Sequence, residues 1–113
     1  MLVEVLKSKL HKATVTGADL HYEGSISIDP QLYRQAGMYT YEKVDIFNVN
    51  TGARFSTYII EGKPGEVCLN GAAARLVAVG DRVIIVSYTQ VESEQAEGWK
   101  PTVVLLGERN IPA

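Results

Sequence analysis

The dipeptide Gly24-Ser25 could supply an electrophile made from the chain itself. A serine hydroxyl can attack the preceding carbonyl and convert the peptide bond to an ester. Elimination from that ester, followed by hydrolysis, leaves a pyruvoyl group at a new N-terminus. Glycine before serine suits this chemistry, because glycine accepts strained backbone conformations and leaves its carbonyl unshielded. Alone, the pair indicates only a turn before a strand, since Gly-Ser arises by chance in roughly half of chains of this composition.

Other common reactive constellations do not occur in the sequence. Two histidines, His11 and His21, and one cysteine cannot form a standard structural zinc site. No glycine-rich phosphate loop precedes a helix, so we expect neither a metal nor pyridoxal phosphate. Cys68 has the apolar neighbours Val67 and Leu69, and we expect it to be an inert structural thiol. An enzyme of this size would therefore find its electrophile within its own chain.

Composition limits the class of protein. The 113 residues are 46% hydrophobic and 21% charged, with a formal net charge of −2, which is typical of one globular domain that does not bind nucleic acid. No apolar run is long enough to cross a membrane, and the first residues do not resemble a signal peptide. A single cysteine excludes an internal disulfide and predicts a cytoplasmic protein.

Strands dominate the hydrophobic pattern. A helix is expected at 30–36, with Asp29 as its N-cap, Pro30 in its first turn and Gly37 at its end. Residues 91–97 are polar and could form a second short helix, and we expect the tail after Gly107 to be loose. The expected strands run over residues 2–15, 25–28, 44–49, 53–60, 66–69, 82–88 and 99–106.

These strands and their turns predict a mainly β fold that closes into a barrel, because closure removes exposed strand edges. The turn at 50–52 makes residues 44–60 a hairpin. The run 83–86 is apolar throughout and predicts a stretch buried on both sides. Lys9 and His11 are two residues apart on the first strand and should share a face.

Six sequence blocks occur in the order found in a known family. Together they resemble the bacterial aspartate 1-decarboxylases of pantothenate synthesis, and the resemblance spans about residues 1–106. It implies a double-psi β-barrel in a single domain. It also implies self-cleavage between Gly24 and Ser25 into a short β chain of residues 1–24 and a longer α chain of residues 25–113. The blocks are Lys9–His11, Ala18–Tyr22, Gly24–Asp29, Arg54–Tyr58, Asn70–Ala74 and Val79–Asp81.

The resemblance also implies roles for the reacting residues. The ketone derived from Ser25 would form a Schiff base with L-aspartate and accept the electrons left by the departing carboxylate. Tyr58 matches the proton donor, and a phenol keeps its proton at neutral pH. Thr57 matches the residue that assists chain cleavage and also contacts substrate. The products would be β-alanine and carbon dioxide.

The remaining site residues implied by the resemblance bind or orient the substrate. Arg54 and Lys9 would hold the two carboxylates of aspartate, although solvated strand positions would be their default interpretation. Backbone N–H groups at Gly71, Ala72 and Ala73 could contact the substrate. The residues expected to orient these groups are His11, Tyr22 and Asn70.

Side-chain alternation creates a conflict within this implied site. On a regular strand, Arg54 and Tyr58 share one face, whereas Thr57 points to the other. A bulge could redirect one of them. We prefer a site between subunits, because the resemblance implies a homotetramer, and we expect Lys9 and Arg54 to come from a different subunit than the Ser25 they serve.

Two other functions are compatible with the sequence. A non-catalytic double-psi barrel that binds a partner would explain the fold but not the Gly24-Ser25 pair. A pyruvoyl decarboxylase could also act on another amino acid, such as glutamate. Whether cleavage needs a maturation factor is left open.

Overall fold

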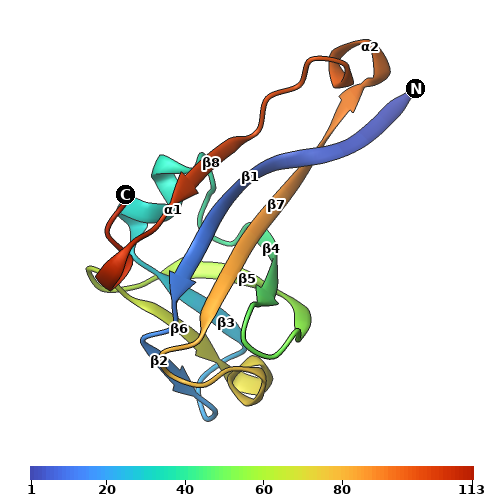
Figure 1. The fold of residues 1–113 in the computed structure, drawn as a ribbon. Helices are drawn as coiled ribbons and strands as arrows, with labels where there is room; N and C mark the ends of the chain where they lie inside the picture. Colours follow the sequence, from blue (N-terminus) through green and yellow to red (C-terminus); the bar gives the residue numbers. More distant parts are fainter.

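The computed structural model describes all 113 residues, and strands make up most of its regular structure (Figure 1). This confirms the prediction of a mainly β fold with short helices. The strands are β1 (Leu2–Thr14), β2 (Gly17–Asp19), β3 (Ser25–Ile28), β4 (Lys43–Asn48), β5 (Arg54–Glu61), β6 (Val67–Asn70), β7 (Arg82–Glu92) and β8 (Thr102–Leu105). The helices are α1 (Pro30–Gln35) and α2 (Ser93–Ala96), with 3-10 helices at η1 (Gly71–Leu76) and η2 (Glu108–Asn110).

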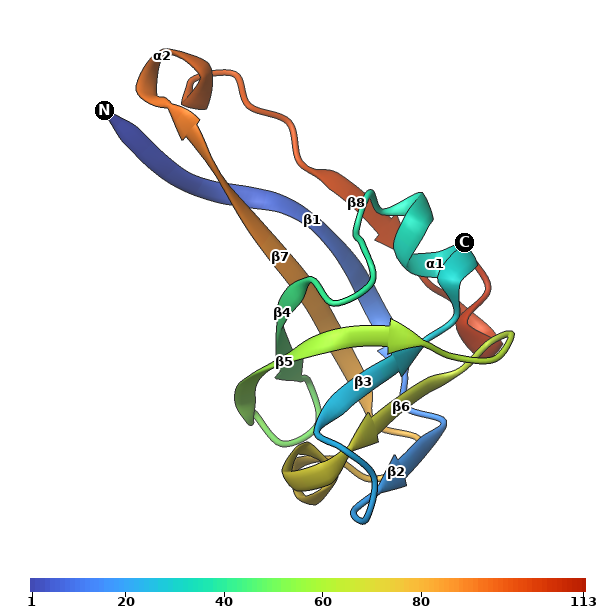
Figure 2. The ribbon, with the colours of Figure 1, turned by 180° about the vertical axis from the view of Figure 1, so that it is seen from behind.

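The strands join in the order β2-β6-β3-β5-β4-β7-β1-β8. Three neighbouring pairs, β1 with β8, β2 with β6 and β3 with β5, are parallel, and the other ladders are antiparallel. Seen from behind, β3, β5 and β6 form the lower body of the molecule, and β1 and β7 run up from it (Figure 2). The double-psi barrel implied by the resemblance remains a prediction.

β1 and β7 form a long antiparallel arm. Their ladder runs from Leu2 opposite Glu92 to Thr14 opposite Arg82, and it carries the N-terminus and α2 at its tip (Figure 1). The arm gives the molecule extents of 43 × 28 × 25 Å. The indole N–H of Trp99 donates to the Leu6 carbonyl at 2.7 Å and ties the segment after α2 to the arm.

The core lies in the body, where 18 buried apolar residues form one cluster. Ile26, Ile59 and Leu69 contribute to it from the adjacent strands β3, β5 and β6, and each is fully buried. Burial of this apolar surface drives these three strands together. The polar neighbours of the three core residues are thereby held at fixed positions on the other face of the sheet.

The start and end of α1 agree with the sequence. The Asp29 carboxylate accepts a hydrogen bond from the Gln31 N–H at 2.9 Å, and Pro30 occupies the first turn. Gly37 follows the helix with a φ of 76°, a left-handed conformation that glycine adopts without strain. Both helix signals are confirmed.

Two strand predictions were wrong in extent. β7 continues to Glu92, so Val91 lies in the arm opposite Val3 and not in a helix; only Ser93–Ala96 is helical. The last strand begins at Thr102 instead of residue 99. The short strand β2 was not predicted at all. Its three residues are held by β6, a pairing with a segment about 50 residues away.

The tail after Gly107 is ordered, contrary to the prediction. Asn110 is 2% exposed, and its carboxamide accepts from the Thr14 N–H at 2.6 Å. The same side chain donates to the carbonyls of Thr14 at 2.9 Å and Gly65 at 3.0 Å. Distant backbone groups therefore fix a segment that has no periodic pattern of its own.

Within β7, Ile84 is only half-buried, so the run 83–86 is not buried on both sides throughout, contrary to the prediction.

Candidate active site

Ser25 lies on the outer face of the sheet beside Tyr58. Ile26 in β3 pairs with Ile59 in the parallel strand β5, and both side chains enter the core. Side chains alternate along a strand, so the residues that precede this pair, Ser25 and Tyr58, lie on neighbouring strands and face away from the core. The structure thus brings together the predicted cleavage residue and the predicted proton donor.

Asn70 holds the Ser25 hydroxyl. Ser25 pairs with Asn70 across β3 and β6, and the Asn70 amide donates to the Ser25 Oγ at 3.0 Å. The same amide donates to the Ser27 Oγ at 3.0 Å. The Ser25 hydroxyl donates in turn to the Glu23 carbonyl at 2.9 Å. Ser25 is 1% exposed and Asn70 3%, so these bonds are largely shielded from water.

Gly71 packs against the predicted cleavage point. Its φ is 68°, and a Cβ there would lie 2.7 Å from the Gly24 Cα and 3.2 Å from the Tyr22 carbonyl. Only glycine fits a position that is both left-handed and this close to another backbone. Gly24 itself is exposed, with no heavy atom within 4 Å of its own Cβ position. The peptide bond before Ser25 is therefore supported on one side and open on the other.

Side chains of β5 alternate regularly between the two faces of the sheet, so the predicted conflict between Thr57 and Tyr58 is present in the structure. Arg54, Ser56 and Tyr58 are exposed, whereas Thr57 is half-buried on the core side, and the β4–β5 ladder has no register shift. Thr57 is thus adjacent to Tyr58 in the chain but points to the opposite face. A bulge, one of the two explanations considered, is therefore absent from the β4–β5 ladder.

The predicted cationic residues lie elsewhere in the chain. Lys9 is on β1, which β5, β4 and β7 separate from β3 in the sheet. Arg54 is four residues from Tyr58, about 13 Å along the strand. Its guanidinium lies 3.8 Å from the centroid of the Phe47 ring, beside a hollow of about 200 Å³. A single chain therefore does not place Lys9 or Arg54 at Ser25.

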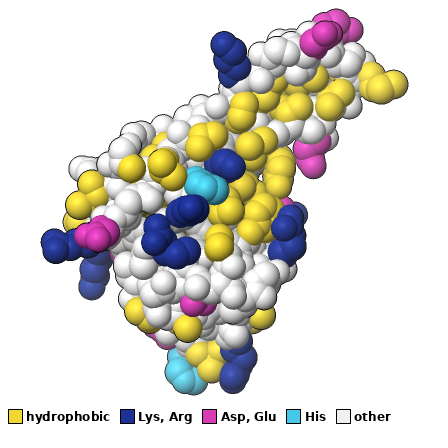
Figure 3. Space-filling model, viewed as in Figure 1, with side chains coloured by type: hydrophobic (Ala, Val, Ile, Leu, Met, Phe, Trp, Pro, Cys, Tyr) yellow, Lys and Arg dark blue, Asp and Glu magenta, His cyan; other side chains and the backbone are white.

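His11 also lies away from Ser25, on β1 near Lys9. Burial, together with the charges of Lys9 and Lys12, lowers its pKa below the ordinary value of histidine, so the ring is neutral at neutral pH. Its Nδ1 is buried and has no hydrogen-bond partner. Basic and hydrophobic side chains lie beside a histidine on the face shown in Figure 3.

The other predicted site residues surround the cleavage point. Ala72 is exposed and Ala73 half-buried in η1, directly after Gly71. Tyr22 is exposed and borders a hollow of about 260 Å³ that Ser27 and Asn70 also line. These residues form the rim of the site.

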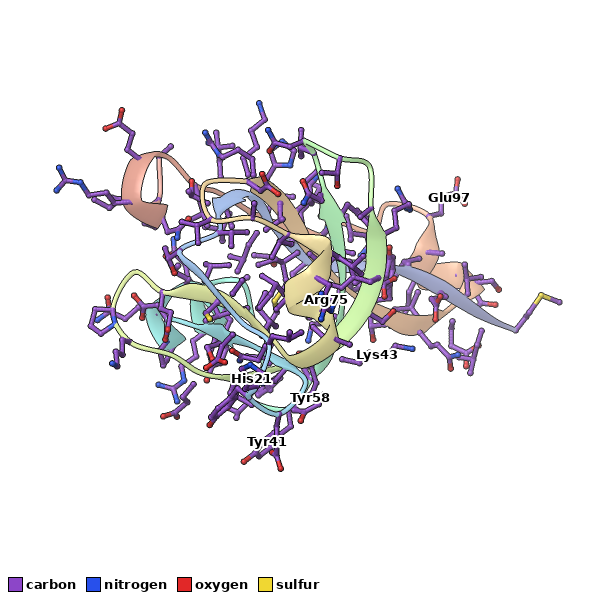
Figure 4. The ribbon with its side chains drawn as sticks, turned by 90° about the horizontal axis from the view of Figure 1, so that it is seen from below. His21, Tyr41, Lys43, Tyr58, Arg75 and Glu97 are labelled. Carbon is purple, nitrogen blue, oxygen red and sulfur yellow. The ribbon has the colours of Figure 1, made fainter.

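Two residues near Tyr58 were not predicted. Lys43 in β4 stands directly opposite Tyr58 in the ladder, and the Tyr41 ring lies 6.5 Å from the Tyr58 ring between centroids (Figure 4). Tyr41 has a φ of 70°, and its N–H donates to the Ile59 carbonyl at 2.7 Å. The register of the predicted hairpin could have identified Lys43. No sequence signal marks Tyr41, because a loop conformation places it.

Cys68 has a more polar setting than its neighbours in sequence suggested. Val67 and Leu69 point into the core, whereas the thiol lies on the outer face, with its Sγ 3.4 Å from the Asn70 Oδ1. Partial burial and the carboxylates of Glu66 and Asp19 raise the pKa of the Cys68 thiol. A thiol with a raised pKa is a poor nucleophile, in line with the unreactive role predicted for it.

The fold and the site define a small mainly β protein with a shielded serine, an amide and a phenol on one face of its sheet. Comparison with known families identifies one family. A family model described as aspartate decarboxylase matches residues 1–112. A Campylobacter hominis protein named aspartate 1-decarboxylase is 56% identical over 110 residues, which cover 97% of this chain and 96% of the relative.

Other relatives agree. A protein of the same name from Syntrophus aciditrophicus is 61% identical over 108 residues, covering 94% of this chain and 93% of the relative. One from Bdellovibrio bacteriovorus is 56% identical over 110 residues, covering 97% and 89%. This chain therefore belongs to the aspartate decarboxylase family, a family of carboxy-lyases, and the predicted resemblance is confirmed. None of its helices is long and apolar enough to cross a membrane.

Proposed function

We propose that this protein converts L-aspartate to β-alanine and carbon dioxide for pantothenate synthesis, using a pyruvoyl group that it makes from Ser25. Membership in the aspartate decarboxylase family supports the substrate and the reaction. The observation that carries the proposal is the arrangement around Ser25. The Ser25 hydroxyl is shielded and held by Asn70, and the strand of Ser25 lies next to the strand of Tyr58. The glycine before Ser25 is closely contacted by Gly71.

Cleavage begins when the Ser25 Oγ attacks the carbonyl carbon of Gly24. The C–N bond breaks, an ester bond forms, and the nitrogen of Ser25 takes up the hydroxyl proton. Loss of the Ser25 α-proton then expels the Gly24 carboxylate and leaves a dehydroalanine. Water replaces the nitrogen, ammonia leaves, and a ketone remains at residue 25. The Ser25 hydroxyl now donates to the Glu23 carbonyl, so it must turn away from that carbonyl to react.

The surroundings of Ser25 fit this change. Gly24 is exposed, which gives the new carboxylate of the short chain access to solvent. Thr57 points to the face of β5 opposite to Tyr58, so it would polarise the Gly24 carbonyl of a neighbouring subunit, in the role that the family resemblance implies. A pyruvoyl group supplies a ketone that draws electrons from the bond to a departing carboxylate.

Tyr58 would return a proton to the carbon that loses the carboxylate. It is on the strand next to Ser25, on the same face, and is 37% exposed. Lys43, opposite Tyr58, would stabilise the phenolate that proton transfer leaves behind. Backbone N–H groups at Ala72 and Ala73, together with Tyr22, would orient the substrate beside this pair.

Lys9 and Arg54 would bind the substrate carboxylates from a neighbouring subunit of a homotetramer. Both residues lie away from Ser25 in the single chain, so a second chain is needed to bring either of them to the site. The arm and the adjacent β8 support association, because they expose apolar side chains along their length (Figure 3). These include Leu2, Tyr88, Val103 and Leu105, each more than 40% exposed. A cytoplasmic location is part of the same proposal.

Intact mass and carbon dioxide release test this function together. The purified chain should split into residues 1–24 and a pyruvoyl-blocked chain beginning at residue 25, and it should release carbon dioxide from aspartate faster than from glutamate. Ser25→Ala should fold, stay whole and show no activity. A fully active chain with an unbroken backbone at Ser25 would overturn the proposal. A chain that stays whole after prolonged warming and binds no substrate would instead support a non-catalytic module.

The same purified preparation tests whether a maturation factor is required. Splitting of the pure chain on warming shows that cleavage needs no other protein. Splitting only after addition of a cell extract shows that it does.

A further inference from the structure

Four polar side chains form a square on the outer face of β3 and β6. Ser25 stands opposite Asn70, and Ser27 stands opposite Cys68. Three of the four are buried, and Cys68 is half-buried. The apolar residues between them point into the core, so the square is held from below by fixed neighbours. The four side chains therefore have defined positions, and each hydrogen bond between them can be assigned.

The Asn70 carboxamide contacts the other three side chains of the square. Its Nδ2 lies 3.0 Å from the oxygens of both Ser25 and Ser27, and its Oδ1 lies 3.4 Å from the Cys68 Sγ. A carboxamide can occupy the same space with its oxygen and nitrogen exchanged. The thiol distinguishes the two arrangements, because a thiol donates a proton but accepts one only weakly. With Cys68 as donor, Oδ1 faces the sulfur and both N–H bonds face the serines.

The setting of Cys68 keeps the thiol in the donor form. Burial, Glu66 and Asp19 raise its pKa above the ordinary value of a cysteine, so it carries its proton at neutral pH. β2 passes beside it with a glycine: a Cβ on Gly17 would lie 3.1 Å from the Cys68 Sγ. Any larger residue at position 17 would press on the sulfur, which would have to shift by a few tenths of an ångström.

We propose that Cys68 is a positioning residue for self-cleavage, which fixes the Asn70 carboxamide so that its N–H group faces the Ser25 nucleophile. The inference rests on the proposed function. It differs from the usual interpretation of a lone buried cysteine, because the thiol acts through a defined hydrogen bond and does not react.

Amide orientation matters to the nucleophile for an electrostatic reason. As Ser25 attacks the Gly24 carbonyl, its oxygen loses a proton and gains negative character. An N–H donor directed at that oxygen favours the deprotonated form. The exchanged carboxamide would instead present a carbonyl oxygen, which would accept the Ser25 proton and hold it in place. The bond from the Ser25 hydroxyl to the Glu23 carbonyl also disfavours this second arrangement, but that bond breaks when the hydroxyl turns toward Gly24. The thiol donor is then the constraint that remains on the carboxamide.

Three substitutions separate hydrogen bonding from packing. Cys68→Ser keeps a donor, Cys68→Val keeps apolar volume without a donor, and Cys68→Ala removes both. The rate of conversion of intact chain to the two fragments should be within about twofold of the parent for Cys68→Ser. It should fall about threefold to tenfold for Cys68→Val and Cys68→Ala, the range expected for one net hydrogen bond. Mass spectrometry of freshly purified chain over time measures these rates.

Two further readouts exclude a merely structural effect. Turnover per cleaved chain should change little in all three variants, because Ser25 is no longer an alcohol after cleavage. Thermal unfolding in a Ser25→Ala background shows whether each variant folds. If Cys68→Val does not fold, the comparison of cleavage rates between Cys68→Ala and Cys68→Ser tests the inference. Equal cleavage rates for the serine variant and the apolar variants overturn the inference. A parent chain that never splits overturns the proposed function instead, so the two failures are distinct.

Discussion

At the scale of single residues, the site combines one reactive group with neighbours that hold it. Ser25 is shielded and bonded to Asn70 and to the Glu23 carbonyl, whereas Tyr58 on the adjacent strand is partly exposed. This difference fits their proposed tasks. The serine reacts with its own backbone, and the phenol must meet a substrate that enters from solvent.

Tyr58→Phe tests the proton donor separately from cleavage. The variant should split like the parent, because the phenol is not needed for the acyl shift. Its decarboxylation rate should fall about 100-fold or more, which is the lower range for loss of a general acid. Carbon dioxide release per cleaved chain measures this. Tyr41→Phe, on the neighbouring ring, is the control and should keep most activity; an active Tyr58→Phe enzyme would exclude the assigned role.

Gly71→Ala tests the close approach to the cleavage point. The new Cβ would lie 2.7 Å from the Gly24 Cα, so the segment before Ser25 must move. We expect cleavage to slow markedly and the free energy of unfolding to drop by about 1–3 kcal/mol. Intact mass and urea unfolding measure the two effects.

Gly98→Ala is the matched control for that substitution. Its φ of 81° is as unfavourable for alanine, but no heavy atom lies within 4 Å of the new Cβ. It should therefore share the cost of backbone strain and still cleave at the parent rate. Equal cleavage of both variants would show that contact between Gly71 and Gly24 does not matter.

At the scale of elements, turns and caps fix where strands begin. Asn48 in β4 is buried and donates to the Asp81 carboxylate at 2.9 Å, and the Ala78 N–H donates to the same oxygen at 2.9 Å. These bonds close the turn before β7. They favour the charged carboxylate and so lower the pKa of Asp81.

The Asp81 bonds predict an acid-sensitive contribution to stability. Because the pKa is lower in the folded state, the unfolded chain binds more protons in acid. The contribution is present above the ordinary aspartate pKa of about 3.9 and is lost as pH falls through the folded pKa. Asp81→Asn should therefore be less stable than the parent near neutral pH and lose less stability on acidification. Urea unfolding at about pH 6 and about pH 3 measures this, and parallel losses would contradict it.

At the scale of the whole molecule, the C-terminal tail closes the fold. Asn110 connects η2 to the end of β1 and to the loop before β6 through three hydrogen bonds. Near it, the parallel pairing of β8 with β1 extends the sheet. The tail therefore contributes to stability even though its sequence shows no apolar periodicity.

Asn110→Ala should lower the free energy of unfolding by about 1–3 kcal/mol, because it leaves half-buried backbone groups at Thr14 and Gly65 without the Asn110 side chain as partner. Urea unfolding in the uncleaved Ser25→Ala background measures the change. Glu108→Ala, on the exposed side of η2, is the control and should change stability little. Equal stability of the two variants would show that the tail does not hold the fold together.

Local patterns in the sequence determined much of this protein: the mainly β composition, the hairpin, both ends of α1, the alternating faces of β5 and the family blocks. Strand periodicity and cap chemistry are properties of neighbouring residues, so they can be found without a structure. Tertiary structure alone decided the pairing of β2 with β6, the order of the tail, the position of Tyr41 and the polar contact of Cys68. Each depends on residues far apart in the chain, and only a packed core brings such residues to hydrogen-bonding distance.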